Sequence, residues 1–261
     1  MHRLCSLLLA TATVCAIVGN GLAQGHTPAH DKPSEPARQS EAMGSFQVRA
    51  YGAFRLFMQK QDYSAKVGLA NARAPGATDG VGALSGLRGE ISLIDGRYIV
   101  SYGGGCKGAC PALHAEQAAL LGTGTVKVWH APVPLPDTLV GKSLDDFIVA
   151  QAKSKGIDTE TPFPLRLTGT LVKVEMHVIE APNAAFTGHG SKVHMAKQDE
   201  FKHDRITGDV VGFYAPSTMH GVLTHPGELF HFHWIDETRT RTAHLDAFGM
   251  EKGSVLLLPK E

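Results

Sequence analysis

The sequence predicts an α+β fold that is mostly antiparallel β-sheet. Glycine is abundant, with 29 of 261 residues, and apolar residues rarely recur at helical spacing, so turns and strands should predominate. Residues 90–102 give the strongest local signal, because Asp95 and Gly96 separate two alternating apolar runs in the manner of a tight β-hairpin. Two helical patterns accompany the strands, which makes the class mixed rather than all-β.

The chain begins with a predicted secretory signal peptide over residues 1–23. Arg3 supplies a positive charge, residues 4–18 are apolar or small, and residues 21–23 resemble a small-residue cleavage site. The apolar stretch is shorter than the roughly 20 residues that a membrane-spanning helix needs. We therefore expect export, either to the periplasm or as a secreted protein, without a membrane anchor.

Residues 24–45 predict a disordered linker, because proline, serine, glutamine, glutamate and histidine dominate and large apolar side chains are few. One folded domain is expected over residues 46–261. Hydrophobic residues make up 43% and charged residues 19% of the chain, which allows a core of ordinary size. The formal net charge is zero, so neither a nucleic-acid partner nor an anionic membrane surface is expected.

Two of the four cysteines, Cys5 and Cys15, would leave with the signal peptide. Cys106 and Cys110 remain, in a glycine-rich segment. Two cysteines this close usually pair in an oxidising compartment. A small loop-closing disulfide is therefore the preferred interpretation, ahead of metal binding or redox chemistry.

Two helices and three further strands are expected in the domain. One helix spans residues 51–61, and the other follows Ser143 as its N-cap. Four apolar residues at helical spacing would form the buried face of the second helix: Leu144, Phe147, Ile148 and Ala152. Runs rich in alternating or β-branched residues predict the strands: residues 165–178, 207–214 and 253–258. Gly169 is expected to bend the first of them.

The most informative segment is a histidine-containing hairpin over residues 230–248. Its first strand alternates in character, so His231 and His233 would project from the same face. A polar turn follows, and then a plausible returning strand. With a tight turn between the two strands, His244 would lie opposite His233, at a distance that lets the side chains interact. Three imidazoles would then converge on one sheet face.

Such a cluster suits a metal ion. Neutral histidines are good zinc ligands, and three of them leave a coordination position for water or substrate. Copper, nickel, iron or another first-row divalent metal would bind the same ligands. The competing interpretation is a polar sheet face without a metal. His220 and His225, in the loop before the hairpin, are candidates to line the entrance of the site, but a plain surface loop is the preferred interpretation for both.

Residues 227–246 resemble the zinc-binding hairpin of the alpha-acetolactate decarboxylase family. Three further segments resemble that family in the same order along the chain: residues 80–90, 163–170 and 208–216. The first of these segments ends at Glu90. Together the resemblance covers nearly all of residues 46–259.

The resemblance implies a fold of two β-rich subdomains that flank a metal site, often in a homodimer. It implies that His231, His233 and His244 hold Zn2+ and that Glu90 moves a proton beside it. The implied partner is a small-molecule 2-hydroxy-3-oxo acid substrate, and the implied reaction converts 2-acetolactate to acetoin and carbon dioxide. The metal would stabilise the charge that develops on the substrate oxygens.

Two departures from the family pattern bear on catalysis. The family's pocket carries an arginine that binds substrate, and the matching position here is His177, which lacks the permanent two-pronged charge of arginine. Arg166 lies on the same predicted strand but at another position. The family also has a C-terminal tail with a second glutamate, for which Glu261 is no expected substitute. A slow decarboxylase, or one with an altered substrate, is therefore expected.

Two other functions are weighed against this one. A non-catalytic exported protein that binds a metal or a small acid on the same scaffold would explain His177, and a closed four-ligand metal sphere would support it. A metal-dependent hydrolase has only the open metal site in its favour. A pocket that brings Glu90 and His177 to the three histidines would favour the decarboxylase.

Overall fold

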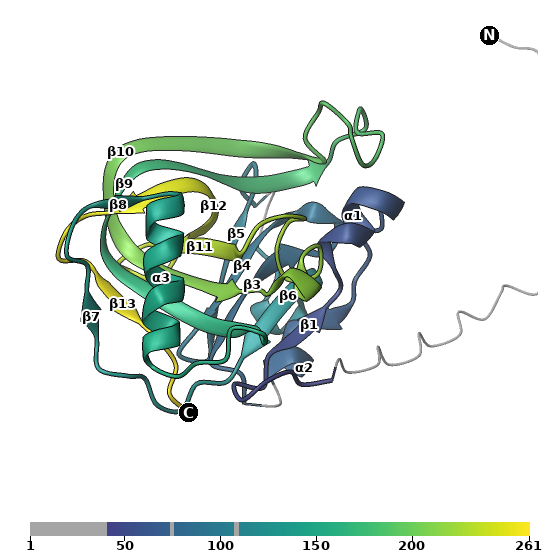
Figure 1. The fold of residues 1–261 in the computed structure, drawn as a ribbon. Helices are drawn as coiled ribbons and strands as arrows, with labels where there is room; N and C mark the ends of the chain where they lie inside the picture. The colour runs from purple at the N-terminus through teal and green to yellow at the C-terminus, as the bar shows by residue number, and fades with distance from the viewer. Residues whose placement is uncertain (1–40, 74–75, 107–109) are drawn as a thin grey trace, which may run out of the picture. The chain divides into compact units, whose positions relative to one another are not determined.

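The computed structural model describes residues 41–73, 76–106 and 110–261, and these residues all belong to one compact unit (Figure 1). The predicted signal peptide and most of the predicted linker lie outside the described residues. Structure shared with the domain begins slightly before the predicted boundary, because Met43 forms an isolated antiparallel bridge with Val48. Met43 also packs against the main hydrophobic core, which ties the last linker residues to the domain.

The first sheet has six antiparallel strands, in the order β1-β6-β3-β4-β5 with β2 beside β6. Its strands are β1 Arg49–Tyr51, β2 Val67–Gly68, β3 Asp79–Leu84, β4 Gly89–Ile94, β5 Arg97–Tyr102 and β6 Gln117–Gly124. The predicted hairpin of residues 90–102 is confirmed as β4 and β5. Asp95 and Gly96 have positive φ values of 50° and 71°, as a two-residue type I′ turn requires.

The second sheet has seven antiparallel strands in the order β7-β13-β9-β10-β11-β12-β8. Its strands are β7 Val133–Pro134, β8 Leu139–Val140, β9 Phe163–Pro182, β10 Ala196–Tyr214, β11 Phe230–Ile235, β12 Thr242–Met250 and β13 Val255–Leu257. Because β12 also pairs with β9, the strands β9, β10, β11 and β12 form a closed ring. Two of the predicted strands are confirmed within β9 and β10. The third, over residues 253–258, is confirmed only in its middle, because β13 is shorter than predicted.

The long strands β9 and β10 curve together, as Figure 1 shows. Gly169, the expected bend in β9, has a φ of 137°, and its partner in β10 is also a glycine, Gly208. Residues with a side chain rarely adopt that φ value. The paired glycines therefore let both strands turn at the same level.

Three α-helices and three short 3₁₀ turns complete the described part of the chain. They are α1 Phe54–Lys60, α2 Leu69–Arg73, α3 Lys142–Ser154, η1 Ser85–Leu87, η2 Leu113–Ala115 and η3 Ser217–Met219. The helix predicted over residues 51–61 starts later, because Tyr51 pairs with Leu121 in the first sheet. Gly52 follows with a φ of 78°, and a side chain there would collide with the carbonyl oxygen of Ala119.

The second predicted helix is confirmed as α3. Three of its four predicted core residues are buried: Leu144, Ile148 and Ala152. Its predicted N-cap is wrong, because the capping position is Gly141. Ser143 lies in the first turn instead, where its hydroxyl donates a hydrogen bond to the carbonyl of Val140. No helix in the described ranges is long and apolar enough to cross a membrane.

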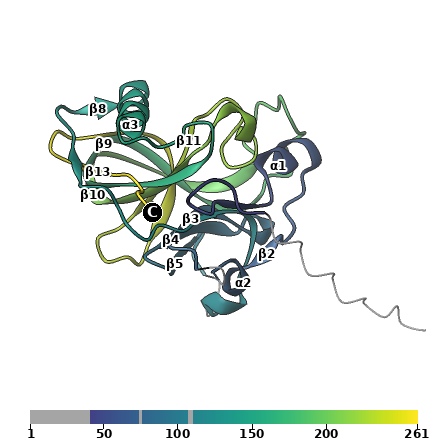
Figure 2. The same ribbon diagram turned by 60° about the horizontal axis from the view of Figure 1, so that its bottom comes forward.

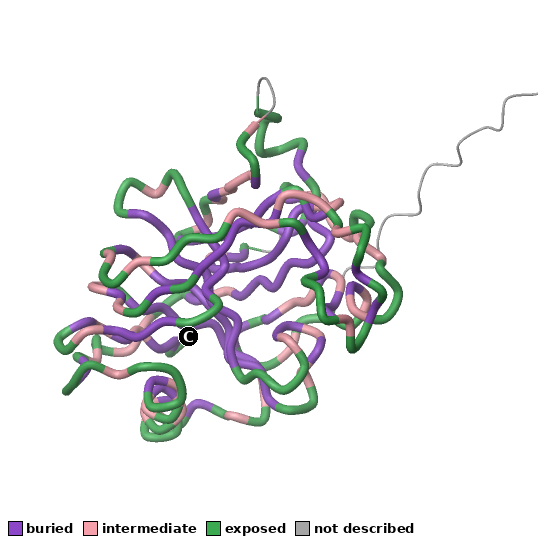
Figure 3. Tube along the Cα trace, turned by 90° about the horizontal axis from the view of Figure 1, so that it is seen from above, coloured by how far each residue is buried: buried purple, intermediate pink, exposed green. Residues whose placement is uncertain are grey.

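The two sheets share one large hydrophobic core. It includes Ile94 from β4, Phe213 from β10 and Ile148 from α3, which lies on the second sheet beside β8 (Figure 2). The central strands are buried and the connecting loops are exposed, as Figure 3 shows. Outside this core, Cys106 and Cys110 form the predicted disulfide. The interface between the sheets is where the histidines meet Glu90.

Candidate metal centre

The predicted histidine hairpin is confirmed as β11 and β12. His233 and His244 are direct partners in the antiparallel register, as the sequence pattern predicts. On the other face of β11, the rings of Phe230 and Phe232 stack with their centroids 5.1 Å apart. The alternation along β11 therefore directs both of its histidines to the same side.

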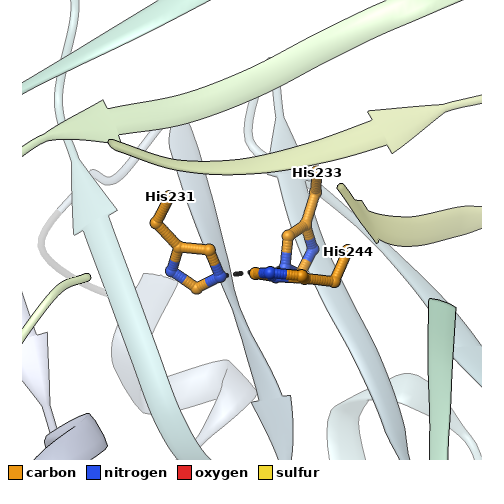
Figure 4. Close-up of side chains that lie close together, drawn as sticks. All are labelled: His231, His233 and His244. Atoms are coloured by element: carbon orange, nitrogen blue, oxygen red, sulfur yellow. Dashed lines mark hydrogen bonds between the residues drawn. The ribbon is translucent and has the colours of Figure 1, made fainter. Parts of the chain in front are cut away.

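His231, His233 and His244 meet in a buried cluster (Figure 4). Each offers a ring nitrogen, and these three atoms lie within 4.8 Å of one another. Nε2 of His231 lies 3.2 Å from Nε2 of His233. Two nitrogens bound to one tetrahedral zinc ion, each at about 2.0–2.1 Å, lie about 3.3 Å apart. The spacing of this pair therefore fits a single bound metal ion such as zinc.

The protonation of the rings also suits a metal. His231 donates its Nδ1 proton to the carbonyl oxygen of Leu223 over 3.0 Å, because a carbonyl can only accept. Its Nε2 atom therefore presents a lone pair toward His233. Burial lowers the pKa of His231 to about 3, and burial together with the neighbouring histidines holds the pKa values of His233 and His244 well below the usual value. Neutral imidazoles are the form that binds a first-row metal ion.

Glu90 lies on β4 and faces the cluster from the opposite sheet. Its Oε2 atom is 3.6 Å from Nε2 of His233, and its Oε1 atom is 3.9 Å from Nε2 of His177. Burial raises the pKa of Glu90 to about 7, although His177 and the backbone N–H of Ile179 act against this rise. A carboxyl group with this pKa can give or take a proton near neutral pH.

His177 lies on β9 beside the same cluster. It is the register partner of His244, and the two ring centroids lie 4.9 Å apart. Its Nδ1 atom lies 2.9 and 2.8 Å from the two carboxylate oxygens of Asp246. Burial disfavours a charge on His177, but Asp246 and Glu90 outweigh burial and raise its pKa. Among the described residues, His177 is outside the group of three whose ligand atoms converge.

A small cavity of about 30 Å³ lies against the cluster and is lined by Glu90 and His177. An outer pocket of about 410 Å³ adjoins it, because His194, His225 and His244 line both. The structure therefore brings every residue of the predicted site to one place, with a larger pocket beside it.

Sequence reasoning misses two residues of this site and prefers the wrong role for a third. Asp246 could have been found, because it follows His244 by two positions and strand alternation puts both on one face. For His225 the preferred surface loop is wrong and the alternative fits, because its ring packs against that of Phe54, with centroids 4.1 Å apart, and lines both the cavity and the outer pocket. His194 lies just before β10, and no local pattern points to it.

Arg166, on the same strand as His177, serves another part of the fold. Its guanidinium pairs with Asp79 and Asp95 and lies over the ring of Trp129. No lysine or arginine is among the described residues that line the small cavity and the outer pocket. Positive charge at this site therefore has to come from histidine or from a bound metal ion.

Comparison with known proteins gives consistent matches. The family model described as Alpha-acetolactate decarboxylase matches residues 51–259. An Alpha-acetolactate decarboxylase of Methanosarcina mazei is 25% identical over 178 residues, which are 68% of this chain and 58% of that protein. One of Lactococcus lactis subsp. cremoris is 26% identical over 188 residues, which are 67% of this chain and 69% of that protein. The match thus spans less than two thirds of the Methanosarcina protein.

Solved structures share the fold. The alpha-acetolactate decarboxylase of Bacillus subtilis strain 168 has a TM-score of 0.64 at 18% identity, with 82% of this chain and 86% of that chain covered. A Staphylococcus aureus protein of unknown function, described as similar to that enzyme, has a TM-score of 0.60 at 20% identity, with 82% and 84% covered. The predicted class, mostly antiparallel sheets with few helices, is confirmed.

Proposed function

Because the chain belongs to the alpha-acetolactate decarboxylase family, we propose that it catalyses the zinc-dependent decarboxylation of 2-acetolactate to acetoin and carbon dioxide. One observation carries this proposal. Three neutral histidines have converging nitrogens, and two of them, His231 and His244, line a cavity together with Glu90, a buried carboxyl group with a pKa of about 7. A Lewis acid and a proton carrier are what this reaction requires.

The reaction breaks one carbon–carbon bond and makes one carbon–hydrogen bond. Acetolactate loses its carboxylate as carbon dioxide, and the bonding electron pair stays on the substrate as an enediolate. One proton must then reach the carbon that lost the carboxylate, which gives acetoin. A zinc ion held by His231, His233 and His244 would supply a Lewis acid for the negative charge on the substrate oxygens. The other residues must hold the substrate, exclude water and deliver the proton.

Glu90 is proposed to deliver that proton. Its side chain is buried and faces the histidine cluster from the other sheet. The backbone N–H of Ile179 donates to Oε1 over 3.4 Å, which leaves Oε2 on the side of His233. Because burial raises its pKa to about 7, part of the Glu90 population is protonated at neutral pH.

His177 is proposed to take the place of the family's arginine as the cationic group. Asp246 accepts the hydrogen bond from its Nδ1 and thereby turns Nε2 toward Glu90. A histidine held in this way donates one hydrogen bond to a substrate oxygen, whereas arginine donates two in parallel. We therefore expect slower decarboxylation than an arginine would support, or a preference for another small 2-hydroxy-3-oxo acid.

The cavities support a small substrate. The inner cavity of about 30 Å³ has room for one or two waters, and the outer pocket of about 410 Å³ has room for a small organic acid. Phe54, Phe57 and Leu120 give the inner cavity an apolar wall. An apolar wall keeps water from competing for the proton and strengthens electrostatic interactions inside.

Export is proposed on the strength of residues 1–23, which lie outside the described residues. The signal-peptide pattern of this segment is its only support. Mass spectrometry of the N-terminus, on protein recovered from the periplasm or the medium, should find a chain that starts at Gln24. Recovery of the intact N-terminus from the cytoplasm alone would contradict export.

The test of the catalytic proposal is acetoin formation from racemic acetolactate. The purified protein is stripped with a chelator, one portion is reloaded with zinc, and both are compared with the unaided decay of the substrate. We expect acetoin above that background only in the zinc-loaded sample. A folded, zinc-loaded protein that forms no acetoin above background would overturn the proposal.

A further inference from the structure

A chain of hydrogen-bonding groups runs from His233 to the backbone of its own strand. Ser92 lies two residues after Glu90 on β4, so both side chains face the second sheet. Its Oγ atom is 3.2 Å from Nδ1 of His233 and 2.6 Å from Oγ1 of Thr242. Thr242 in turn donates its hydroxyl proton to the carbonyl oxygen of Trp234 over 2.9 Å. Both hydroxyl residues are buried, with exposed fractions of 0% for Ser92 and 1% for Thr242.

The hydrogen bonds of this network have one set of directions that leaves His233 ready to bind a metal ion. The carbonyl of Trp234 can only accept, so the single hydroxyl proton of Thr242 is used there. Thr242 must then accept from Ser92, which uses the single hydroxyl proton of Ser92. Ser92 therefore has only an acceptor left for His233. Nδ1 of His233 then carries the ring proton, and Nε2 keeps the lone pair that a metal ion needs. Without a metal ion the opposite tautomer competes, because Nε2 of His233 lies 3.2 Å from Nε2 of His231, which can only accept there.

From this geometry we infer that Ser92 and Thr242 are positioning residues, which fix the tautomer and the ring orientation of His233 so that Nε2 faces the metal centre. The inference rests on the proposed metal site but is independent of the reaction performed there. Outer partners of this kind orient metal-binding histidines and raise their affinity for the ion. Neither residue touches the cavity or the outer pocket, so neither is proposed to contact substrate.

The hydrogen-bonded groups also join the two sheets, because the two hydroxyl groups come from different sheets. Ser92 belongs to the first sheet, while His233 and Thr242 belong to the second. The backbone N–H of Thr242 also donates to the hydroxyl of Ser101 on β5, over 2.8 Å. Correct packing of the two sheets is therefore needed for the ring of His233 to be held. The ring of His231 is held without the other sheet, because its Nδ1 donates to the backbone carbonyl of Leu223 in the loop before β11.

The test uses four variants of the full chain. Ser92→Ala removes the acceptor for His233, and Thr242→Val removes the acceptor for Ser92 at nearly constant volume. Thr242→Ser keeps the hydroxyl group and is the conservative rescue. Thr123→Val is the matched control, because Thr123 is equally buried but is paired with Arg49 and Gly80, away from the histidine strands.

The first readout is nitrogen-15 NMR of the histidine rings in the zinc-loaded protein. His233 should bind zinc through Nε2 and show an Nδ1–H signal that exchanges slowly with water, because Ser92 accepts this hydrogen bond. In a folded Ser92→Ala sample the signal should exchange faster. Zinc bound through Nδ1 of His233, or an Nδ1–H signal that is unchanged in Ser92→Ala, would overturn the inference, whatever the activity of the protein.

The second readout is metal binding, measured by chelator competition for zinc and by the visible absorption of the cobalt-loaded protein. For Ser92→Ala and Thr242→Val we expect zinc affinity about 10–100-fold below wild type and a changed cobalt spectrum. Thr242→Ser and Thr123→Val should match the wild type in both. Wild-type affinity and spectrum in a folded Thr242→Val protein would contradict the inference. Absent acetoin formation alongside these results would count against the proposed reaction only.

Discussion

His177 and His244 are direct register partners on β9 and β12, and their ring centroids lie 4.9 Å apart. His244 is also the register partner of His233 on β11. Three histidines from three neighbouring strands therefore lie in one row, and Glu90 approaches them from the other sheet. Because strand pairing sets this row, the site is more rigid than a site built on loops. Each residue of the row can be tested separately.

Removal of a proposed ligand should abolish tight zinc binding. His233→Ala takes away one of three converging nitrogens, so we expect zinc affinity to fall by more than about a hundredfold, beyond the loss typical of an outer partner. The zinc content after dialysis measures this loss of affinity, and circular dichroism confirms that the variant is folded. His114→Ala, in the exposed turn η2, is the control and should keep full zinc content. Tight binding of zinc to His233→Ala would show that the ion lies elsewhere.

Glu90→Gln should separate metal binding from catalysis. The amide keeps the size of the side chain but cannot carry the proton, so the rate of acetoin formation should fall by about a hundredfold or more. Zinc content should stay at the wild-type level, because Glu90 is outside the ligand group. The measurement is kcat at matched zinc occupancy. A kcat within a few-fold of wild type would remove Glu90 from the proposed mechanism.

His177→Gln should lower the rate without loss of the metal. Glutamine can still donate a hydrogen bond but carries no positive charge, so loss of about a hundredfold in kcat/KM is expected. His203→Gln on β10 is the matched control, because His203 lines neither the small cavity nor the outer pocket. Loss of zinc together with activity would contradict the assigned role and would make His177 a fourth ligand.

The buried pair of Arg166 and Asp79 should contribute strongly to stability. Both side chains are nearly inaccessible to solvent, so Arg166→Met leaves the buried carboxylate of Asp79 without its cationic partner. We expect the free energy of unfolding to fall by about 3–5 kcal/mol. Arg241→Met is the control, since Arg241 is exposed and lies 3.8 Å from Asp236, and it should cost about 0–1 kcal/mol. Denaturant titration compares the two, and equal losses would refute the assignment.

Asp145 should make stability depend on pH. Burial, with a contribution from Asp146, raises its pKa in the folded protein from 3.8 to about 6. A carboxyl group with a raised pKa favours folding only while it is protonated. Its contribution to the free energy of unfolding is therefore present in full below about pH 4 and is lost as the pH rises to about 6. Asp145→Asn should therefore gain stability over wild type through that range.

Thermal unfolding at pH 4, 5, 6 and 7 measures this effect. The exposed Asp137→Asn, which lies outside the pockets near the cluster, is the control and should track wild type at each pH. If the difference in unfolding temperature between Asp145→Asn and wild type is the same at every pH, titration of Asp145 does not cause that difference.

The parts of the fold that depend on neighbouring residues could be predicted from the sequence. The Asp95-Gly96 hairpin and the pairing of His233 with His244 both follow from tight turns between alternating strands. The contact of β9 with β12 joins residues far apart in the chain, and no local pattern encodes it. The place of His177 therefore rested on family resemblance, and the place of Asp246 beside it was missed.

Burial changes the meaning of residues that look ordinary in the sequence. Glu90 opens a hairpin strand and would be solvated if the hairpin stood alone. Packing of the second sheet buries it and raises its pKa to about 7. Ser92 and Thr242 likewise become partners of His233 only when the sheets meet. Chemistry that depends on the docking of two sheets cannot be derived from either sheet's sequence.

The most direct test of the central claim is the handedness of the acetoin product, measured by chiral gas chromatography. Unaided decay of racemic acetolactate protonates the product carbon from either side and gives racemic acetoin. A proton delivered by Glu90, from one side of a buried site, should give one enantiomer in excess when zinc is present. Glu90→Gln and the zinc-stripped protein should both lose that excess. Racemic acetoin from the zinc-loaded wild-type protein, at the rate of unaided decay, would contradict the account.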